Sequence, residues 1–182
     1  MTNDVKLADK AVYRVVIQAS LEAVWSTLVK TDEVLPFFFG SVCDTGGQAI
    51  APGRPIRMVT PNGKFAAVVG EVLEFSPPHR YVHSFKMTHL DDVPCVVAYE
   101  LEETPEGVVF TLTTTNVPAG TKTQKSMAQG GPFITDNLKA LVETGKPAFS
   151  GRMVVMMAPL TGLMTPAQCR IENWPLEAGR YL

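Results

Sequence analysis

The sequence predicts an α+β domain in which a meandering antiparallel sheet is followed by a long C-terminal helix. Strand-like runs joined by short loops occur at 54–60, 64–75, 80–87, 95–103 and 107–117. After Gly120 the spacing of apolar residues changes to that of a helix. Strands joined by short loops are expected to run antiparallel, because parallel pairs need long crossover connections.

A strand and two short helices are expected before this series. Residues 11–18, AVYRVVIQ, are rich in strand formers. Ser20 is a suitable N-cap for a helix that follows at once. The apolar stripe of this helix consists of Leu21, Val24, Trp25 and Leu28. Pro36 limits a second short helix.

A Pro-Asn-Gly turn at 61–63 predicts a hairpin between the runs on either side of it. Asn-Gly is the strongest short-range hairpin signal, because both residues tolerate the positive φ angles of a type I′ turn. In the second strand of this hairpin Glu71 and Glu74 have opposite parity. Either the sequence leaves undecided which residues of that strand face inward, or the strand contains a bulge near Gly70.

The closing helix is expected in SMAQGGPFITDNLKALVETG, which ends at Gly145. Its helical spacing is carried by Met127, Ile134, Leu138, Leu141 and Val142. In a helix interior Gly costs about 1 kcal/mol and Pro about 3 kcal/mol. Gly130, Gly131 and Pro132 are therefore expected to bend or break the helix, or to move its start to residue 132.

Size and charge limit the functions that are open to the chain. With 182 residues, 46% of them hydrophobic, it can bury one sizeable core. We expect one domain at 1–147 and an extension rich in Met at 148–182. Sixteen Lys and Arg against 18 Asp and Glu give a net charge of -2. Nothing in that balance favours nucleic acid or an anionic membrane as a partner.

The cysteines and the apolar segments predict a cytoplasmic protein with free thiols. Cys43, Cys95 and Cys169 form no CxxC motif and leave one thiol unpaired in any disulfide scheme. The first ten residues, MTNDVKLADK, contain no apolar signal core. The longest apolar stretch, 153–164, is interrupted by Pro and Gly and is shorter than the roughly 20 residues of a membrane span.

The stretch SPPHRYVHSF places His79 and His83 four residues apart, which is a zinc-binding spacing on a helix. Pro77 and Pro78 disfavour a helix here, and the residues that follow them are strand formers. In a strand the two histidines would lie roughly 13 Å apart, at about 3.3 Å per residue. We therefore expect no metal, and no motif indicates a cofactor.

Four segments carry a resemblance to a known family: IQASLEAVWSTL, GEVLEFSPPHRYVHSF, VAYELEETPEGVVFTLTTTNV and NLKALVETG, within about residues 11–145. In order and spacing they resemble the START-like superfamily (SRPBCC, birch-pollen-allergen-like), in the branch of the activator of heat-shock protein 90 ATPase homologue. The resemblance implies a helix-grip fold: a curved antiparallel sheet wrapped around a long C-terminal helix, with two short helices after the first strand.

The chain departs from the family pattern in two places. Family members often begin the closing helix with Gly-Trp, where this chain has Gly131, Pro132 and Phe133. The chaperone activator proper has an additional N-terminal domain that contacts the chaperone, whereas ten residues precede the first strand here. This difference argues against chaperone activation, and a chaperone-linked or other protein-interaction role stays as an alternative.

In a helix-grip fold the space between sheet and helix is either a packed core or an apolar ligand cavity. If Arg57, Lys86, Glu100 and Glu102 face water, the alternate residues of their strands face inward. Together with residues of the two helices, the predicted cavity set is Trp25, Ile56, Met58, Tyr81, His83, Phe85, Met87, Val97, Tyr99, Phe110, Leu112, Met127, Phe133 and Ile134.

Three functions fit these observations. The first is a non-enzymatic binding module for a small apolar or aromatic ligand, and the second is a chaperone-linked or other protein-interaction domain. The third is a cyclase-like or hydrolytic enzyme that uses His83. This is the one residue predicted to face inward whose side chain ordinarily titrates near neutral pH. No GxSxG, HExxH, P-loop or GxGxxG motif supports catalysis.

The extension has two interpretations. Its apolar side chains could cover the sheet or cavity mouth of the same chain, or they could pack against a second copy as a homodimer. The side chains that could share one helical face are Met153, Met156, Met157 and Leu160.

Overall fold

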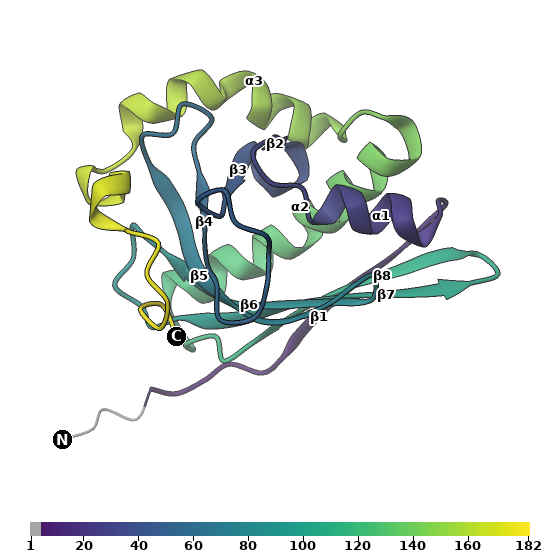
Figure 1. Ribbon diagram of the computed structural model, residues 1–182, viewed down its shortest axis with the longest axis horizontal. Coiled ribbons are helices and arrows are strands. Elements are labelled where there is room, and N and C mark those ends of the chain that lie inside the picture. The colour runs from purple at the N-terminus through teal and green to yellow at the C-terminus, as the bar shows by residue number, and fades with distance from the viewer. Residues whose placement is uncertain (1–4) are drawn as a thin grey trace.

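An eight-stranded antiparallel sheet curls around one long helix (Figure 1). The computed structural model describes residues 5–182, except for the side chains of 159–164. The strand order is β1-β8-β7-β6-β5-β4-β3-β2. The bounds are β1 Ala11–Ile17, β2 Val34–Leu35, β3 Ser41–Asp44, β4 Pro55–Val59, β5 Ala66–Ser76, β6 Arg80–Met87, β7 Cys95–Thr104 and β8 Gly107–Thr115.

The helices are α1 Leu21–Leu28, α2 Lys122–Thr144 and α3 Phe149–Met164, with short 3₁₀ turns η1 Pro36–Phe38, η2 Ala167–Cys169 and η3 Ile171–Asn173. Helix α2 lies along the concave side of the sheet (Figure 1). The predicted α+β class and helix-grip architecture are confirmed. The second short helix takes the form of the 3₁₀ turn η1, and β2 and β3 were not predicted.

Helix α1 begins where its cap was predicted. The Ser20 side chain accepts a hydrogen bond from the Ala23 amide at 3.2 Å. The predicted apolar stripe is buried, and its Trp25 ring lies 5.4 Å from that of Phe75 on β5. The helix thereby covers one end of the concave face.

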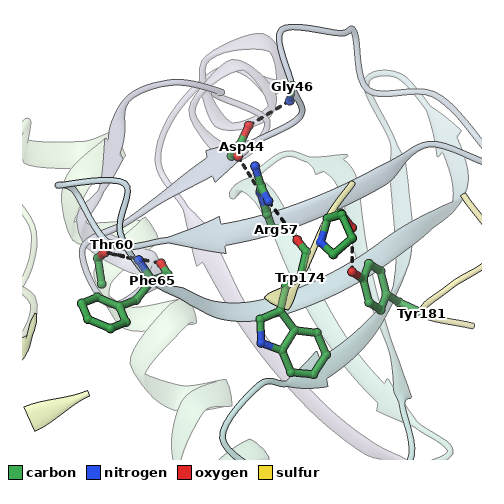
Figure 2. Close-up of polar contacts among 8 residues, drawn as sticks. Asp44, Gly46, Arg57, Thr60, Phe65, Trp174 and Tyr181 are labelled. Atoms are coloured by element: carbon green, nitrogen blue, oxygen red, sulfur yellow. Dashed lines mark hydrogen bonds and ion pairs between the residues drawn. The ribbon is translucent and has the colours of Figure 1, made fainter. Parts of the chain in front are cut away.

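The β4–β5 hairpin forms, but the predicted type I′ turn is wrong. The Gly63 amide donates to the Thr60 carbonyl at 2.8 Å, so the turn is centred on Pro61 and Asn62. Within 60–65 only Gly63 has a positive φ, 69°. The fixed φ of Pro61 favours an ordinary type I turn at this position. Figure 2 shows the hydrogen bonds between Thr60 and Phe65 that close the loop.

An irregularity in β5 accounts for the opposite parity of its two glutamates. The β5–β6 register shifts between Val72 and Glu74, three residues beyond the predicted bulge near Gly70. Glu71 is buried and accepts a hydrogen bond from the Gly179 amide. Glu74 instead accepts from the Arg80 guanidinium at 2.8 Å. Each of the two carboxylates therefore has a hydrogen-bond donor.

Helix α2 runs unbroken from Lys122 to Thr144 with Pro132 inside it, so the predicted break or later start is wrong. Its two glycines lie on the buried face, where neighbouring rings occupy the space of the missing side chains. A Cβ on Gly131 would lie 2.3 Å from the ring of Tyr13 on β1, and one on Gly130 would lie 3.7 Å from the ring of Phe39. Close packing against β1 and η1 outweighs the low helix propensity of Gly-Gly-Pro.

The segment after α3 packs on the convex face of the sheet (Figures 1 and 2). Arg57 on β4 donates to the Asp44 carboxylate at 2.6 Å and to the Trp174 carbonyl at 2.8 Å. Ser84 on β6 donates to the Tyr181 carbonyl at 2.6 Å. A small second apolar cluster forms there from Val59, Ala66, Val69 and Tyr181. The domain boundary between 147 and 148 stays a prediction.

Helix α3 packs on α2 and η1, where Val155 lies against Gly40. Its Met153, Met156 and Met157 side chains are exposed, and Leu160 lies outside the described side chains. Because these three methionines are exposed, packing of α3 against a second copy of the chain remains an alternative. Among the described residues, no helix has the length and apolarity to cross a membrane.

The adjacent glycines of α2 give a matched pair of variants. Gly131→Ala is expected to destabilise the protein by about 1–3 kcal/mol, because its methyl group collides with the Tyr13 ring and either the ring or the helix must move. Gly130→Ala fits at ordinary contact distance and is expected to stabilise by up to about 1 kcal/mol through helix propensity. Urea denaturation measures both. Equal effects would contradict the proposed close approach of α2 to β1.

Candidate functional site

A cavity of about 460 Å³ lies between α2, η1 and the concave face of the sheet. Phe85 and Met87 of β6 and Val97 and Tyr99 of β7 line it from the sheet. Its remaining walls come from β8, the beginnings of β3 and β5, the η1 region and the middle of α2. Alternation along the strands places these side chains on the inner face.

The mouth of the cavity is marked by a stacked pair of aromatic rings. Phe39 has a left-handed backbone (φ 54°) and is 45% exposed. Its ring stacks on Phe133 of α2, with centroids 4.2 Å apart and planes 8° from parallel. Ala67, His89 and Gln129 are the other exposed residues of the lining. The cavity therefore opens between η1, α2 and the loop after β6.

The structure divides the fourteen predicted residues into two groups. Eight line the cavity: Phe85, Met87, Val97, Tyr99, Leu112, Met127, Phe133 and Ile134. Six are buried in the core outside the cavity wall: Trp25, Ile56, Met58, Tyr81, His83 and Phe110. Two members of the second group, Trp25 of α1 and Tyr81 of β6, pack on either side of Phe75. Ligand contact stays a prediction for all fourteen.

The sequence interpretation did not include several lining residues. These are Phe38, Phe39, Ser41, Ala67, Val68, His89, Thr114, Ser126, Gln129, Gly130 and Gly131. The run PFFFG was the available signal for the first two, because three successive aromatic side chains on a tight turn cannot all face one core. Ala67 and Val68 lie in the strand whose facing the sequence left open.

His83 is enclosed in the sheet. It is 1% exposed, its Nδ1 lies 2.8 Å from the Ser84 carbonyl, and its Nε2 lies 3.4 Å from the Tyr99 hydroxyl. Burial lowers the pKa of His83 to about 4, although the hydrogen bond to Ser84 acts in the opposite direction. The imidazole is therefore neutral near pH 7. Because a carbonyl only accepts, the hydrogen of this neutral ring is on Nδ1.

Burial also keeps the nearby thiols and phenols protonated. It raises the pKa of Cys43 to about 12, with Asp44 and Asp32 adding to the effect, and that of Cys95 to about 11. The pKa values of Tyr81 and Tyr99 are raised by the same cause. Neither thiol has the lowered pKa of a nucleophilic cysteine. The Tyr81 hydroxyl is buried without a hydrogen-bond partner.

His79 and His83 have different surroundings. His79 is exposed, and its Nδ1 lies 3.2 Å from the Leu101 carbonyl, whereas His83 is buried beside Tyr99. Across the described residues, no group of three or more His, Cys, Asp or Glu side chains could hold a metal ion.

Residues 18–143, more than half of the chain, match the family described as "Activator of Hsp90 ATPase homolog 1-like protein". The chain belongs to this family. The START-like assignment made from the sequence is confirmed. Family and fold together indicate a START-like module of the ligand-binding kind. No curated protein matches this chain in sequence.

Solved structures with the same fold share little sequence with this member of the activator homologue family. DynU16, from the dynemicin biosynthetic locus, is 20% identical with a TM-score of 0.61, over 77% of this chain and 49% of its own. This chain therefore spans about half the length of DynU16. Protein MLL2253 from Mesorhizobium loti is 21% identical with a TM-score of 0.60, over 74% of this chain and 96% of its own. The Aha1 dimer from Colwellia psychrerythraea is 18% identical with a TM-score of 0.60, over 76% of this chain and 99% of its own.

The lowered pKa of His83 predicts a loss of stability in acid. Between the ordinary pKa of 6.5 and about 4, the unfolded chain binds a proton at this residue and the folded protein does not. The free energy of unfolding therefore falls as pH falls through that window, by on the order of 3 kcal/mol at pH 4. His83→Gln should lose that part of the pH dependence in urea denaturation at pH 7 and pH 4.5.

The exposed His79 supplies the control. His79→Gln removes a histidine without removing the buried one and should keep the wild-type pH profile. Parallel profiles for wild type and His83→Gln would show that His83 is not buried as a neutral ring.

Proposed function

We propose that the protein is a non-catalytic binding module whose cavity takes one small apolar or aromatic molecule. The cavity of about 460 Å³ with its mostly apolar walls is the observation that carries this proposal. Ligand pockets commonly have volumes of roughly 300–1,000 Å³ and bury most of the ligand surface. Burial of apolar area contributes about 25 cal/mol per Å², so a well-fitting apolar molecule gains several kcal/mol on entry.

The chemistry of the walls supports binding over catalysis. Among the described lining residues, only His89 and Tyr99 can ionise, and His89 lies at the mouth. His83 lies outside the wall and uses its Nδ1 hydrogen on Ser84. General acid–base catalysis needs a titratable group within hydrogen-bond reach of the reacting atom. An enzyme that uses His83 would instead show turnover that His83→Ala abolishes.

A protein-interaction role is the second candidate, and the exposed apolar side chains of α3 are the observation that favours it. Phe149, Met156 and Met157 are at least half exposed on this helix. Exposed apolar patches of this kind often mark contact sites. We propose a homodimer as the simplest such partner, since a protein of the same fold is described as a dimer. We also propose a cytoplasmic location. The three buried cysteines are free thiols, which agrees with a reducing compartment.

Two buried phenylalanines of the sheet, Phe85 on β6 and Phe110 on β8, test the cavity. Phe110 is fully buried outside the cavity, so Phe110→Ala should cost about 3–5 kcal/mol. Phe85 borders existing empty space, so Phe85→Ala should cost about 1–2 kcal/mol less and should change the affinity for an environment-sensitive apolar dye. Urea denaturation and dye fluorescence measure the two effects.

The two outcomes separate a cavity from a packed core. Equal stability losses, together with no dye binding by the wild type, would mean that the space is filled in solution. The ligand-binding proposal would then be dropped in favour of the protein-interaction role.

A further inference from the structure

Four residues with hydroxyl groups interrupt the apolar wall of the cavity. Ser126 is only partly buried, whereas Ser41, Tyr99 and Thr114 are 8%, 3% and 2% exposed. Within the described part of the lining there is no Asp, Glu, Lys or Arg. The interior is therefore polar at a few points but carries no charge. This pattern limits the chemical class of the ligand, given the binding function proposed above.

The direction of the hydrogen bonds can be followed from Ser84 to the cavity wall. His83 carries its hydrogen on Nδ1, because that atom faces the Ser84 carbonyl. The Nε2 of the neutral ring is therefore an acceptor, and the Tyr99 hydroxyl donates to it across 3.4 Å. With its proton committed to His83, the Tyr99 oxygen offers the cavity only lone pairs. It can accept a hydrogen bond from a ligand but not donate one.

Thr114 lies on the same patch of wall as Tyr99. In the β7–β8 register Tyr99 pairs with Leu112 and Val97 pairs with Thr114, so Tyr99 and Thr114 are diagonal neighbours on the inner face. The Thr114 residue is 2% exposed, and its hydroxyl makes no hydrogen bond to another described residue. A ligand that covered this hydroxyl without bonding to it would leave it buried and unpaired at a cost of about 1–3 kcal/mol, so a ligand group that satisfies it gains affinity.

We propose that the cavity selects an uncharged molecule with an apolar body and one hydroxyl group, a phenol or an alcohol. The ligand O–H donates to the Tyr99 oxygen, and the ligand oxygen accepts from the Thr114 hydroxyl. A carboxylate is disfavoured, because the described lining offers no cation to offset the loss of its hydration. A pure hydrocarbon is disfavoured because it leaves the Thr114 hydroxyl without a partner and offers no donor to the Tyr99 oxygen.

Three probes of similar shape test this selectivity. 2-Naphthol carries the donor, 2-methylnaphthalene replaces it by a methyl group, and 2-naphthoate carries a negative charge. Fluorescence titration of the full chain should show 2-naphthol binding about five- to tenfold more tightly than 2-methylnaphthalene, as expected for one hydrogen bond. 2-Naphthoate should bind most weakly.

Variants assign the selectivity to Tyr99. Tyr99→Phe should bring the ratio of the 2-naphthol and 2-methylnaphthalene affinities close to one, while the affinity for 2-methylnaphthalene is kept. Tyr81→Phe is the matched control, because Tyr81 is equally buried but does not line the cavity. If Tyr99→Phe does not fold, Thr114→Val provides a second test and should lower the same ratio.

His83 is a positioning residue in this arrangement, and His83→Leu gives a readout that a structural role alone would not produce. Without the His83 acceptor, the Tyr99 hydroxyl is free to donate into the cavity. The variant should therefore gain affinity for 2-acetylnaphthalene, whose carbonyl only accepts, relative to 2-naphthol. An unchanged ratio would contradict the assigned direction of the hydrogen bonds.

The probe results separate this inference from the proposed function. If the wild type binds none of the three probes, the binding module itself is wrong. If 2-methylnaphthalene binds as tightly as 2-naphthol, the binding module stands and the selection of a hydroxyl is wrong. Preferential binding of 2-naphthoate would overturn the inference that the interior excludes charge.

Discussion

The contact of α2 with β1, at Gly131 over the ring of Tyr13, is the constraint on which the rest of the structure depends. A side chain at Gly131 would collide with that ring, so glycine allows the helix to lie directly on β1. Helix α2 packs mainly on β1 and η1, and the curved sheet lies beneath it (Figure 1). The helix is therefore held on β1, and the cavity lies between the middle of α2, the η1 region and the inner faces of β6, β7 and β8.

The convex face supplies the support for a sheet that is not fully packed on its concave side. Ser84 accepts from the Glu71 amide at 2.8 Å and donates to the Tyr181 carbonyl at 2.6 Å, which ties β5, β6 and the C-terminal segment together. Arg57 connects β3, β4 and the same segment (Figure 2). Strands next to the cavity are thus held from outside by hydrogen bonds.

Sequence periodicity was sufficient to predict which residues lie on the inner face of the sheet, but not which of them line the cavity. Alternation correctly placed Tyr81, His83 and Phe85 on the concave side, but of these only Phe85 lines the cavity. The difference depends on what packs against each side chain: Tyr81 lies against the ring of Phe75, whereas Phe85 borders the open space. Such packing leaves no periodic pattern in the sequence.

Local rules failed where packing between distant segments determined the conformation. The Gly-Gly-Pro run predicted a broken helix, yet the rings of Tyr13 and Phe39 fill the space beside its two glycines. Phe39 adopts a left-handed backbone conformation that no local rule predicts for an aromatic residue. In this conformation its ring stacks on that of Phe133. Both features border the cavity, so the site was the least predictable part of the fold.

The central claim is that the space under α2 is open and apolar in the folded protein. A crystal structure determined under xenon pressure tests this most directly, because xenon enters dry apolar cavities and is readily seen. The account predicts xenon between Phe85, Leu112 and Ile134, with their side chains in place. A structure in which α2 has closed onto β6 and β7, with side chains filling the space and no xenon bound, would contradict it.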